Sequence, residues 1–316
     1  MEAGGRPAPA APLRRRRLGL SPAPPSGPRL EALRRCLLAW GEANRRDLPW
    51  RQTRDPWAVL VSEVMLQQTQ AARVVGPYGR FLARFPDPAA CAGAGAADVV
   101  RAWAGLGYNR RAVHLWGAAS AVVEHHGGRV PSDLTSLRAL PGVGAYTARA
   151  VLAFAFEADT GVVDTNVARL LARAVAGRPL TAGGAQGLAD ALVPPGRSWA
   201  FNQALFDLGA RHCTARRPDC GGCPLRRKCR WARAGGPQPD PAAGSALTAR
   251  RQTRFEGSDR QGRGRLVAEL RAGPLHEGDL AGAAGWAADP DRARRAAEAL
   301  VADGVAAWVA GSLVLA

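Results

Sequence analysis

Lysine is nearly absent from this sequence, because Lys228 is its only lysine and its other basic residues are arginines. Apolar runs of the roughly 18 residues that a membrane-spanning helix needs are also missing. Runs of β-branched residues that alternate with polar ones are almost absent, which argues against a sheet-based core. Apolar periodicity of three to four residues instead predicts an all-α fold for residues 30–231.

Positive charge is concentrated in two segments, although the net charge of the chain is +17. Residues 1–29 contain six arginines and one glutamate, and residues 209–233 contain seven arginines and Lys228 against Asp219. Residues 234–316 are balanced in charge. Such clustering predicts a polyanionic partner such as DNA, and a compositional bias toward arginine is the alternative.

The first 29 residues are rich in Pro, Ala and Arg and have no helical or strand period. This composition predicts a disordered basic arm. The arginine run is followed by only three residues before Ser21-Pro22, which is too short for a secretory signal. We therefore expect a cytoplasmic protein, with a transit peptide as the alternative.

A glycine hairpin is predicted where the sequence reads LPGVGAYTA, residues 140–148. Pro141 should end one helix, because the residue before a proline avoids the helical region. Gly142 and Gly144 permit the left-handed or crowded backbone of a tight reversal. The main-chain N–H groups of such a turn can bind a phosphate, although an ordinary helix–helix turn has the same pattern.

Two carboxylates stand at positions suited to chemistry. Glu63 lies among apolar residues on a helix that is expected to begin at Asp55-Pro56, and Gln67 shares its face. Desolvation there would raise the pKa of Glu63 and keep a proton available. Asp164 precedes another predicted helix, where a helix cap is the alternative role.

Four cysteines lie within 17 residues with the spacing C-x6-C-x2-C-x5-C: Cys213, Cys220, Cys223 and Cys229. A group this compact, in a chain without a secretion signal, indicates metal ligands rather than disulfides. Four thiolates suit either zinc or a [4Fe-4S] cluster, and the spacing alone does not decide between them.

Taken in order, these segments resemble the helix-hairpin-helix DNA glycosylase superfamily, and within it the A/G-specific (MutY-type) adenine DNA glycosylases. The resemblance covers about residues 30–231 and rests on SEVMLQQTQ (62–70), the hairpin, VDTNV (163–167) and the cysteines. It implies a two-lobed all-α fold with a [4Fe-4S] loop, and zinc becomes the minor reading. It also implies a monomer that acts on double-stranded DNA containing A:8-oxoguanine or A:G mispairs.

The resemblance implies that Glu63 protonates N7 of adenine. Asp164 would face the sugar and either stabilise the positive charge that develops there or act as a transient nucleophile. Tyr146 and Asn166 match positions that orient this pair. Breaking a glycosidic bond with two carboxylates in different environments follows the chemistry of glycoside hydrolysis. The target base must be flipped out of the duplex to reach them.

Further DNA contacts are implied by the same resemblance. Gln68 would fill the gap left by the flipped base, and the hairpin amides of Gly142, Val143 and Gly144 would bind a DNA phosphate with a monovalent cation. The remaining positions fall into two groups, the adenine pocket (Arg46, Leu48, Trp50 and Gln67) and the neighbourhood of the opposite base (Thr69, Leu106 and Tyr108). For Trp50 and Tyr108 the alternative is a core aromatic.

Tyr146 distinguishes subfamilies, because endonuclease III and its relatives carry a nucleophilic lysine at this position. The only lysine here, Lys228, lies between two of the clustered cysteines. The sequence therefore predicts a monofunctional glycosylase. An endonuclease III-like pyrimidine glycosylase/lyase and a non-catalytic iron–sulfur DNA-binding protein are the alternatives.

The C-terminal residues 251–316 depart from the family pattern. Three short helices followed by one or two strands around Gly311 predict a small winged-helix-like α/β domain, and a protein-interaction module is the alternative. This segment is too short for the Nudix-like domain with which typical members read 8-oxoguanine. The complete predicted division is a basic arm (1–29), a glycosylase core (30–231) with a six-helix lobe (about 56–163) and an iron–sulfur lobe (30–55 and 164–231), a linker (232–250) and the C-terminal domain.

Overall fold

The computed structural model describes residues 27–245 and 254–316. The arginine run of the predicted arm and residues 246–250 of the predicted linker lie outside the described residues. Helix α1 (Pro28–Asn44) begins two residues earlier than the predicted start at Leu30, with Pro28 in its first turn. Proline is common at this position because the N–H group that it lacks would have no intrahelical partner in the first turn.

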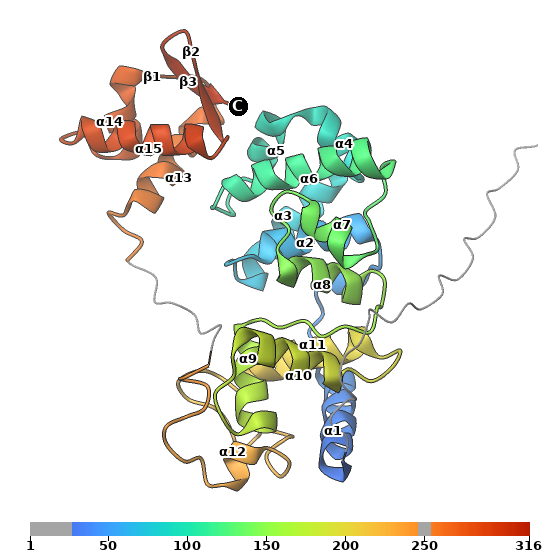
Figure 1. The fold of residues 1–316 in the computed structure, drawn as a ribbon. Coiled ribbons are helices and arrows are strands. Elements are labelled where there is room, and N and C mark those ends of the chain that lie inside the picture. Colours follow the sequence, from blue (N-terminus) through green and yellow to red (C-terminus); the bar gives the residue numbers. More distant parts are fainter. Residues whose placement is uncertain (1–26, 246–253) are drawn as a thin grey trace, which may run out of the picture.

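One lobe is built around helix α2 (Pro56–Leu66), which is buried from Trp57 to Met65. Asp55 caps it as predicted, because its side chain accepts a hydrogen bond of 2.7 Å from the Ala58 amide. Six further helices complete this lobe (Figure 1). They are α3 (Ala71–Arg84), α4 (Pro88–Ala94), α5 (Ala96–Ala102), α6 (Arg110–His126), α7 (Leu134–Ala139) and α8 (Ala145–Phe154).

The second lobe brings helix α1 together with segments that follow residue 164 (Figure 1). Gly41 lets α1 approach helix α11 closely, since a Cβ there would lie 2.5 Å from that of Ala204. Leu33, Leu37 and Phe201 are fully buried in this lobe. Its other elements are α9 (Thr165–Leu170), the π-helical turn η2 (Leu171–Ala176), α10 (Ala182–Leu192), α11 (Ser198–Arg211) and α12 (Arg230–Arg233). The connection between the lobes includes a short 3₁₀ turn, η1 (Pro49–Arg51).

The predicted hairpin lies between α7 and α8. Leu140 is extended before Pro141, so α7 ends at Ala139. Gly142 has a φ of +72°, and a Cβ there would meet the His114 side chain at 2.6 Å. Gly144 has an ordinary extended backbone (φ −82°, ψ 178°), so the left-handed conformation expected of this pair occurs only at Gly142.

The C-terminal residues form the predicted three helices and a β wing. Helices α13 (Asp259–Leu270), α14 (Leu280–Ala284) and α15 (Pro290–Ala302) are followed by strands β2 (Ala306–Val309) and β3 (Ser312–Leu315). A two-residue strand β1 (Leu275–His276) completes an antiparallel sheet of order β1-β3-β2, with a 3₁₀ turn η3 (Glu277–Asp279) after it. Two residues are too few to show an alternating pattern, so the sequence did not indicate β1.

This small domain docks beside helix α6 on the first lobe, which has seven helices (α2–α8) where the sequence predicted six. Arg271 donates hydrogen bonds to the Asn109 side chain (3.1 Å) and the Val100 carbonyl (3.3 Å). Asp303 forms ion pairs with Arg263 of its own domain and with Arg110 of α6. The N-terminal end of α6 therefore contacts the C-terminal domain as well as its own lobe.

Candidate active site

Glu63 lies in the buried middle of α2 and is only 4% exposed. Burial raises the pKa of its carboxyl to about 7, and it outweighs the opposing effects of a hydrogen bond with Tyr146 and the charge of Arg51. Its Oε2 atom has no hydrogen-bond partner among the described residues. Glu63 is thus protonated in about half of the molecules near pH 7, where an ordinary glutamate would be ionised.

Tyr146 and Asp164 lie beside Glu63, although they come from other helices. Tyr146 is in the first turn of α8, where burial and the two neighbouring carboxylates raise the pKa of its phenol well above the ordinary value. It is therefore neutral and serves as a hydrogen-bonding group. Asp164 adds its charge to the factors that raise the pKa of Glu63.

The Asp164 carboxylate is fixed at the N-terminus of α9. It accepts hydrogen bonds from the Val167 amide (2.7 Å) and from the side chain of Asn166 (2.8 Å). Asp164 is thus a helix cap, as its position also allowed, and the positive end of the helix stabilises its negative charge. Asn166 is held in turn by Arg169 (2.8 Å), which also donates to the carbonyl oxygens of Gly209 and Cys213.

A buried ion-pair group next to this site was missed by the sequence analysis. Asp207 of α11 accepts two hydrogen bonds from Arg51, at 2.7 and 2.9 Å, and one of 2.6 Å from Nε of Arg46. Burial alone would raise the pKa of Asp207, but the two arginines lower it below its ordinary value. The signal available in the sequence was a lone aspartate within the apolar helix at 198–211.

The residues predicted to line an adenine pocket differ in their surroundings. Arg46 is partly exposed and is held by Asp207. Trp50 is buried and packs edge-on against Tyr78, with ring centroids 5.6 Å apart, and Leu48 packs partly buried against the same core. Gln67 ends α2, and its side-chain amide donates to the Thr147 hydroxyl at 3.3 Å.

Two loops project beside α2, and each has an exposed side chain at a left-handed residue. Gln68 has a φ of 55° and Tyr108 a φ of 46°, a conformation that strains residues other than glycine. Tyr108 is 41% exposed, so it is not a core aromatic. Leu106 is buried, and the Thr69 hydroxyl donates to the Gln67 carbonyl (3.3 Å).

The hairpin presents its backbone outward at Gly142 and Gly144, which are both exposed, while the Val143 side chain is buried. Apart from the glycine and its own neighbours in the chain, no atom of the described residues lies within 4 Å of a Cβ built on Gly144. The space in front of this residue is therefore open to a ligand such as a phosphate.

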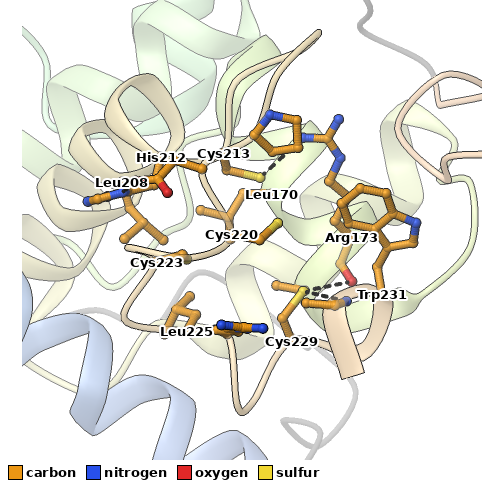
Figure 2. Close-up of a pocket in the computed structure, with 15 residues that line it drawn as sticks. Leu170, Arg173, Leu208, His212, Cys213, Cys220, Cys223, Leu225, Cys229 and Trp231 are labelled. Carbon is orange, nitrogen blue, oxygen red and sulfur yellow. Dashed lines mark hydrogen bonds and ion pairs between the residues drawn. The ribbon is translucent and has the colours of Figure 1, made fainter. Parts of the chain in front are cut away.

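The four clustered cysteines line one pocket in the second lobe, as Figure 2 shows. None of them forms a disulfide. Arg173 reaches the sulfur of Cys213 at 3.5 Å, and the sulfur of Cys229 accepts from the Ala232 amide at the same distance. As placed, no three Cys, His, Asp or Glu side chains in residues 27–245 and 254–316 converge closely enough to hold a single metal ion.

The segment after the cysteines is not a free tether. Asp240 forms an ion pair with Arg173, with Oδ1 accepting from Nε at 3.0 Å, and Ala242 and Ser245 are buried. Residues 232–245, which the sequence suggested as linker, therefore pack onto the cysteine-containing lobe. None of the helices in the described ranges is both long and apolar enough to cross a membrane.

The chain is similar to known proteins at the level of a superfamily and of a narrower family. Residues 61–182 match the family model of the HhH-GPD superfamily base excision DNA repair proteins. A solved structure of a thermostable thymine-DNA glycosylase is 30% identical, with a TM-score of 0.61 over 65% of this chain and 97% of that one. The fold is therefore that of a helix-hairpin-helix DNA glycosylase.

Two relatives identify the family within this superfamily. The adenine DNA glycosylase of Mycobacterium tuberculosis is 47% identical over 84% of this chain and 88% of its own length. That of Mycolicibacterium smegmatis is 44% identical over 85% of this chain and 90% of its own length. The chain belongs to the adenine DNA glycosylase family, and it is a DNA N-glycosylase of base excision repair.

Proposed function

We propose that this enzyme removes adenine paired with 8-oxoguanine or guanine from double-stranded DNA by hydrolysing the N-glycosidic bond. The observation that carries the proposal is Glu63, a buried carboxyl with a pKa of about 7 and a free oxygen beside Asp164 and Tyr146. A purine is a poor leaving group until it is protonated, and Glu63 can supply that proton at neutral pH. An enzyme with this substrate acts on chromosomal DNA, and we place it in the cytoplasm with the nucleoid.

Asp164 would stabilise positive charge on the sugar, whereas Glu63 would donate a proton to the base. Its two hydrogen bonds and the start of α9 stabilise the carboxylate, which can balance the positive charge on the sugar as the bond breaks. Tyr146 orients Glu63 and has no amine to form a Schiff base. Because Lys228 is the only lysine of the chain and lies in the cysteine loop, we propose hydrolysis without a lyase step.

Residues on several sides of Glu63 and Asp164 would hold the DNA. The hairpin amides around Gly142 and Gly144 would bind a backbone phosphate, Gln68 would occupy the space left by the flipped adenine, and Tyr108 would contact the opposite base. The exposure of these residues supports the assignment. Arg46, Leu48, Trp50 and Gln67 would surround the adenine.

The four cysteines would hold a [4Fe-4S] cluster. Zinc requires four sulfurs within about 2.3 Å of one point, whereas a cluster is bound at separate iron atoms and suits sulfurs spread around a pocket. When bound, the cluster would connect the ends of the loop at 213–229. The chain's own arginines there, among them Arg226 and Arg227, would then face DNA phosphates on a fixed surface.

Single-turnover base release from four duplexes, A:8-oxoguanine, A:G, A:T and T:G, tests the activity. We expect adenine release from the first two and not from the third. Equal rates on the first two would mean that the oxidised base is not distinguished from guanine. Thymine release from T:G would favour the thymine-DNA glycosylase activity named for the solved structure of similar fold.

Substitutions of the two carboxylates and borohydride trapping test the proposed mechanism. Glu63→Gln and Asp164→Asn should abolish release while DNA binding persists, with the exposed Glu124→Gln as a matched control. Borohydride reduction should leave no covalent enzyme–DNA adduct. A robust adduct would refute the monofunctional mechanism, and tight binding without release by the unmodified enzyme would refute catalysis.

A further inference from the structure

Arg111 is a buried arginine that neither the sequence motifs nor the proposed chemistry uses. It lies in the first turn of α6 and is only 8% exposed. Burial lowers the pKa of its guanidinium to about 10, and among the described residues no carboxylate pairs with it. A buried cation without a counter-ion is costly unless hydrogen bonds replace its water, so its acceptors indicate what it is there to hold.

Those acceptors come from two segments that are far apart in the sequence. One nitrogen, Nη1, donates to three carbonyl oxygens at the end of α2: Val64 (3.0 Å), Met65 (2.8 Å) and Gln67 (2.6 Å). The other, Nη2, donates to the Thr69 hydroxyl (3.1 Å) and to the carbonyl oxygens of Leu106 (3.3 Å) and Gly107 (3.1 Å). One planar guanidinium therefore joins the loop that follows Leu66 to the loop that precedes α6.

The bonded carbonyls have a particular relation to the two strained residues. Gln67 directly precedes Gln68, and Gly107 directly precedes Tyr108. A carbonyl oxygen lies in the same plane as the next residue's N–H, so holding it fixes the peptide on which that residue's φ depends. Left-handed conformations in residues other than glycine persist only when the surroundings impose them. Arg111 imposes both.

We infer that Arg111 is a positioning residue that presents Gln68 and Tyr108 to the duplex as one unit. The inference rests on the proposed function, in which these two side chains enter the DNA beside the target adenine. Arg111 itself touches neither base nor sugar. Its effect should therefore fall on extrusion of the adenine and not on cleavage of the bond once the base is in the site.

The experiment measures base extrusion apart from cleavage. Glu63→Gln protein, in which release is blocked, is mixed with a duplex that carries 2-aminopurine in place of the target adenine, and unstacking is followed by fluorescence. The same measurement is made with Arg111→Met and Arg111→Lys added. Arg101→Met is the control, because Arg101 is exposed and, in the described part of the chain, pairs only with Asp98 on the same lobe. Thermal unfolding of every variant shows whether it folds.

We expect Arg111→Met to lower the equilibrium constant for extrusion about tenfold or more, the equivalent of one lost hydrogen bond to a charged group. Lysine keeps the charge but has three donors on one nitrogen and cannot span both loops, so Arg111→Lys should also be impaired. With Glu63 restored, release of adenine placed opposite an abasic analogue, where no base pair has to open, should change much less than release from A:G.

Two results would overturn the inference. One is unchanged 2-aminopurine fluorescence in folded Arg111→Met and Arg111→Lys proteins. The other is an equal loss of release from paired and unpaired adenine, which would mean that Arg111 acts by supporting the catalytic helix α2. Absence of adenine release by the unsubstituted enzyme from either duplex is a different result, because it would refute the proposed function itself.

Discussion

Substituting Glu63 with glutamine keeps the shape of the side chain and removes its titratable proton. Burial raises the pKa of Glu63 from 4.5 to about 7. Above that pH the protonated fraction, and with it kcat/KM for adenine release, should fall about tenfold per pH unit, so that at pH 9 it is about 100-fold below its plateau. Glu63→Gln should be inactive at every pH.

The same shift has a consequence for stability. The folded protein holds the Glu63 proton more tightly than the unfolded chain, so the stabilisation this proton provides is complete below pH 4.5 and is lost as the pH rises to about 7. At about 1.4 kcal/mol per pKa unit, the full loss is roughly 3 kcal/mol. Glu63→Gln avoids it, and should be more stable than the unsubstituted enzyme by up to this amount at pH 8–9, with only about 1 kcal/mol or less of difference near pH 5.

The assays are kcat/KM for release from A:G between pH 5.5 and 9, and urea unfolding followed by circular dichroism at pH 5 and at pH 9. Glu124→Gln, at an exposed position, should reproduce the unsubstituted enzyme in both. A rate that stays level from pH 6 to 9 would refute the assignment of Glu63 as the acid. A Glu63→Gln protein that loses stability relative to the unsubstituted enzyme as the pH rises would refute the burial argument.

Three further outcomes are expected. Asp207→Asn should lower the free energy of unfolding by about 3–5 kcal/mol in urea titrations, because Arg51 is left buried without its partner, and a loss below 1 kcal/mol would contradict this. Tyr146→Phe removes a hydrogen bond that opposes the effect of burial on Glu63, so the alkaline limb of the pH–rate profile should move to higher pH, and a shift to lower pH would show the reverse role. Cys223→Ser should abolish the absorbance near 400 nm expected of a cluster, measured on protein purified without oxygen, whereas retained absorbance would exclude this cysteine as a ligand.

Local features were predictable because they depend on residues three or four positions apart. Asp55 and Asp164 cap helices through amides three residues ahead, and Pro141 ends α7 where the sequence placed the turn. The cysteine spacing likewise predicted that one short loop would bring the four thiols to a common pocket. The three helices and the β wing of the C-terminal domain followed from the same kind of short-range pattern.

Other properties exist only in the folded molecule. Glu63 is a helical carboxylate in the sequence, and burial is what gives it a proton at neutral pH. Asp207 meets Arg51 across 156 positions, and no pattern within a single helix marks that pair.

Arg111 shows most clearly which features the sequence determines and which features only the tertiary structure determines. The sequence showed one arginine among many at the start of a helix, while the order of the motifs was enough to assign the family. Packing of α6 against α2 then placed its guanidinium between two loops that lie about 40 residues apart in the chain. Hydrogen-bond patterns within a helix or turn are encoded locally, whereas desolvation and long-range pairing depend on which elements pack together, and that is decided by tertiary structure.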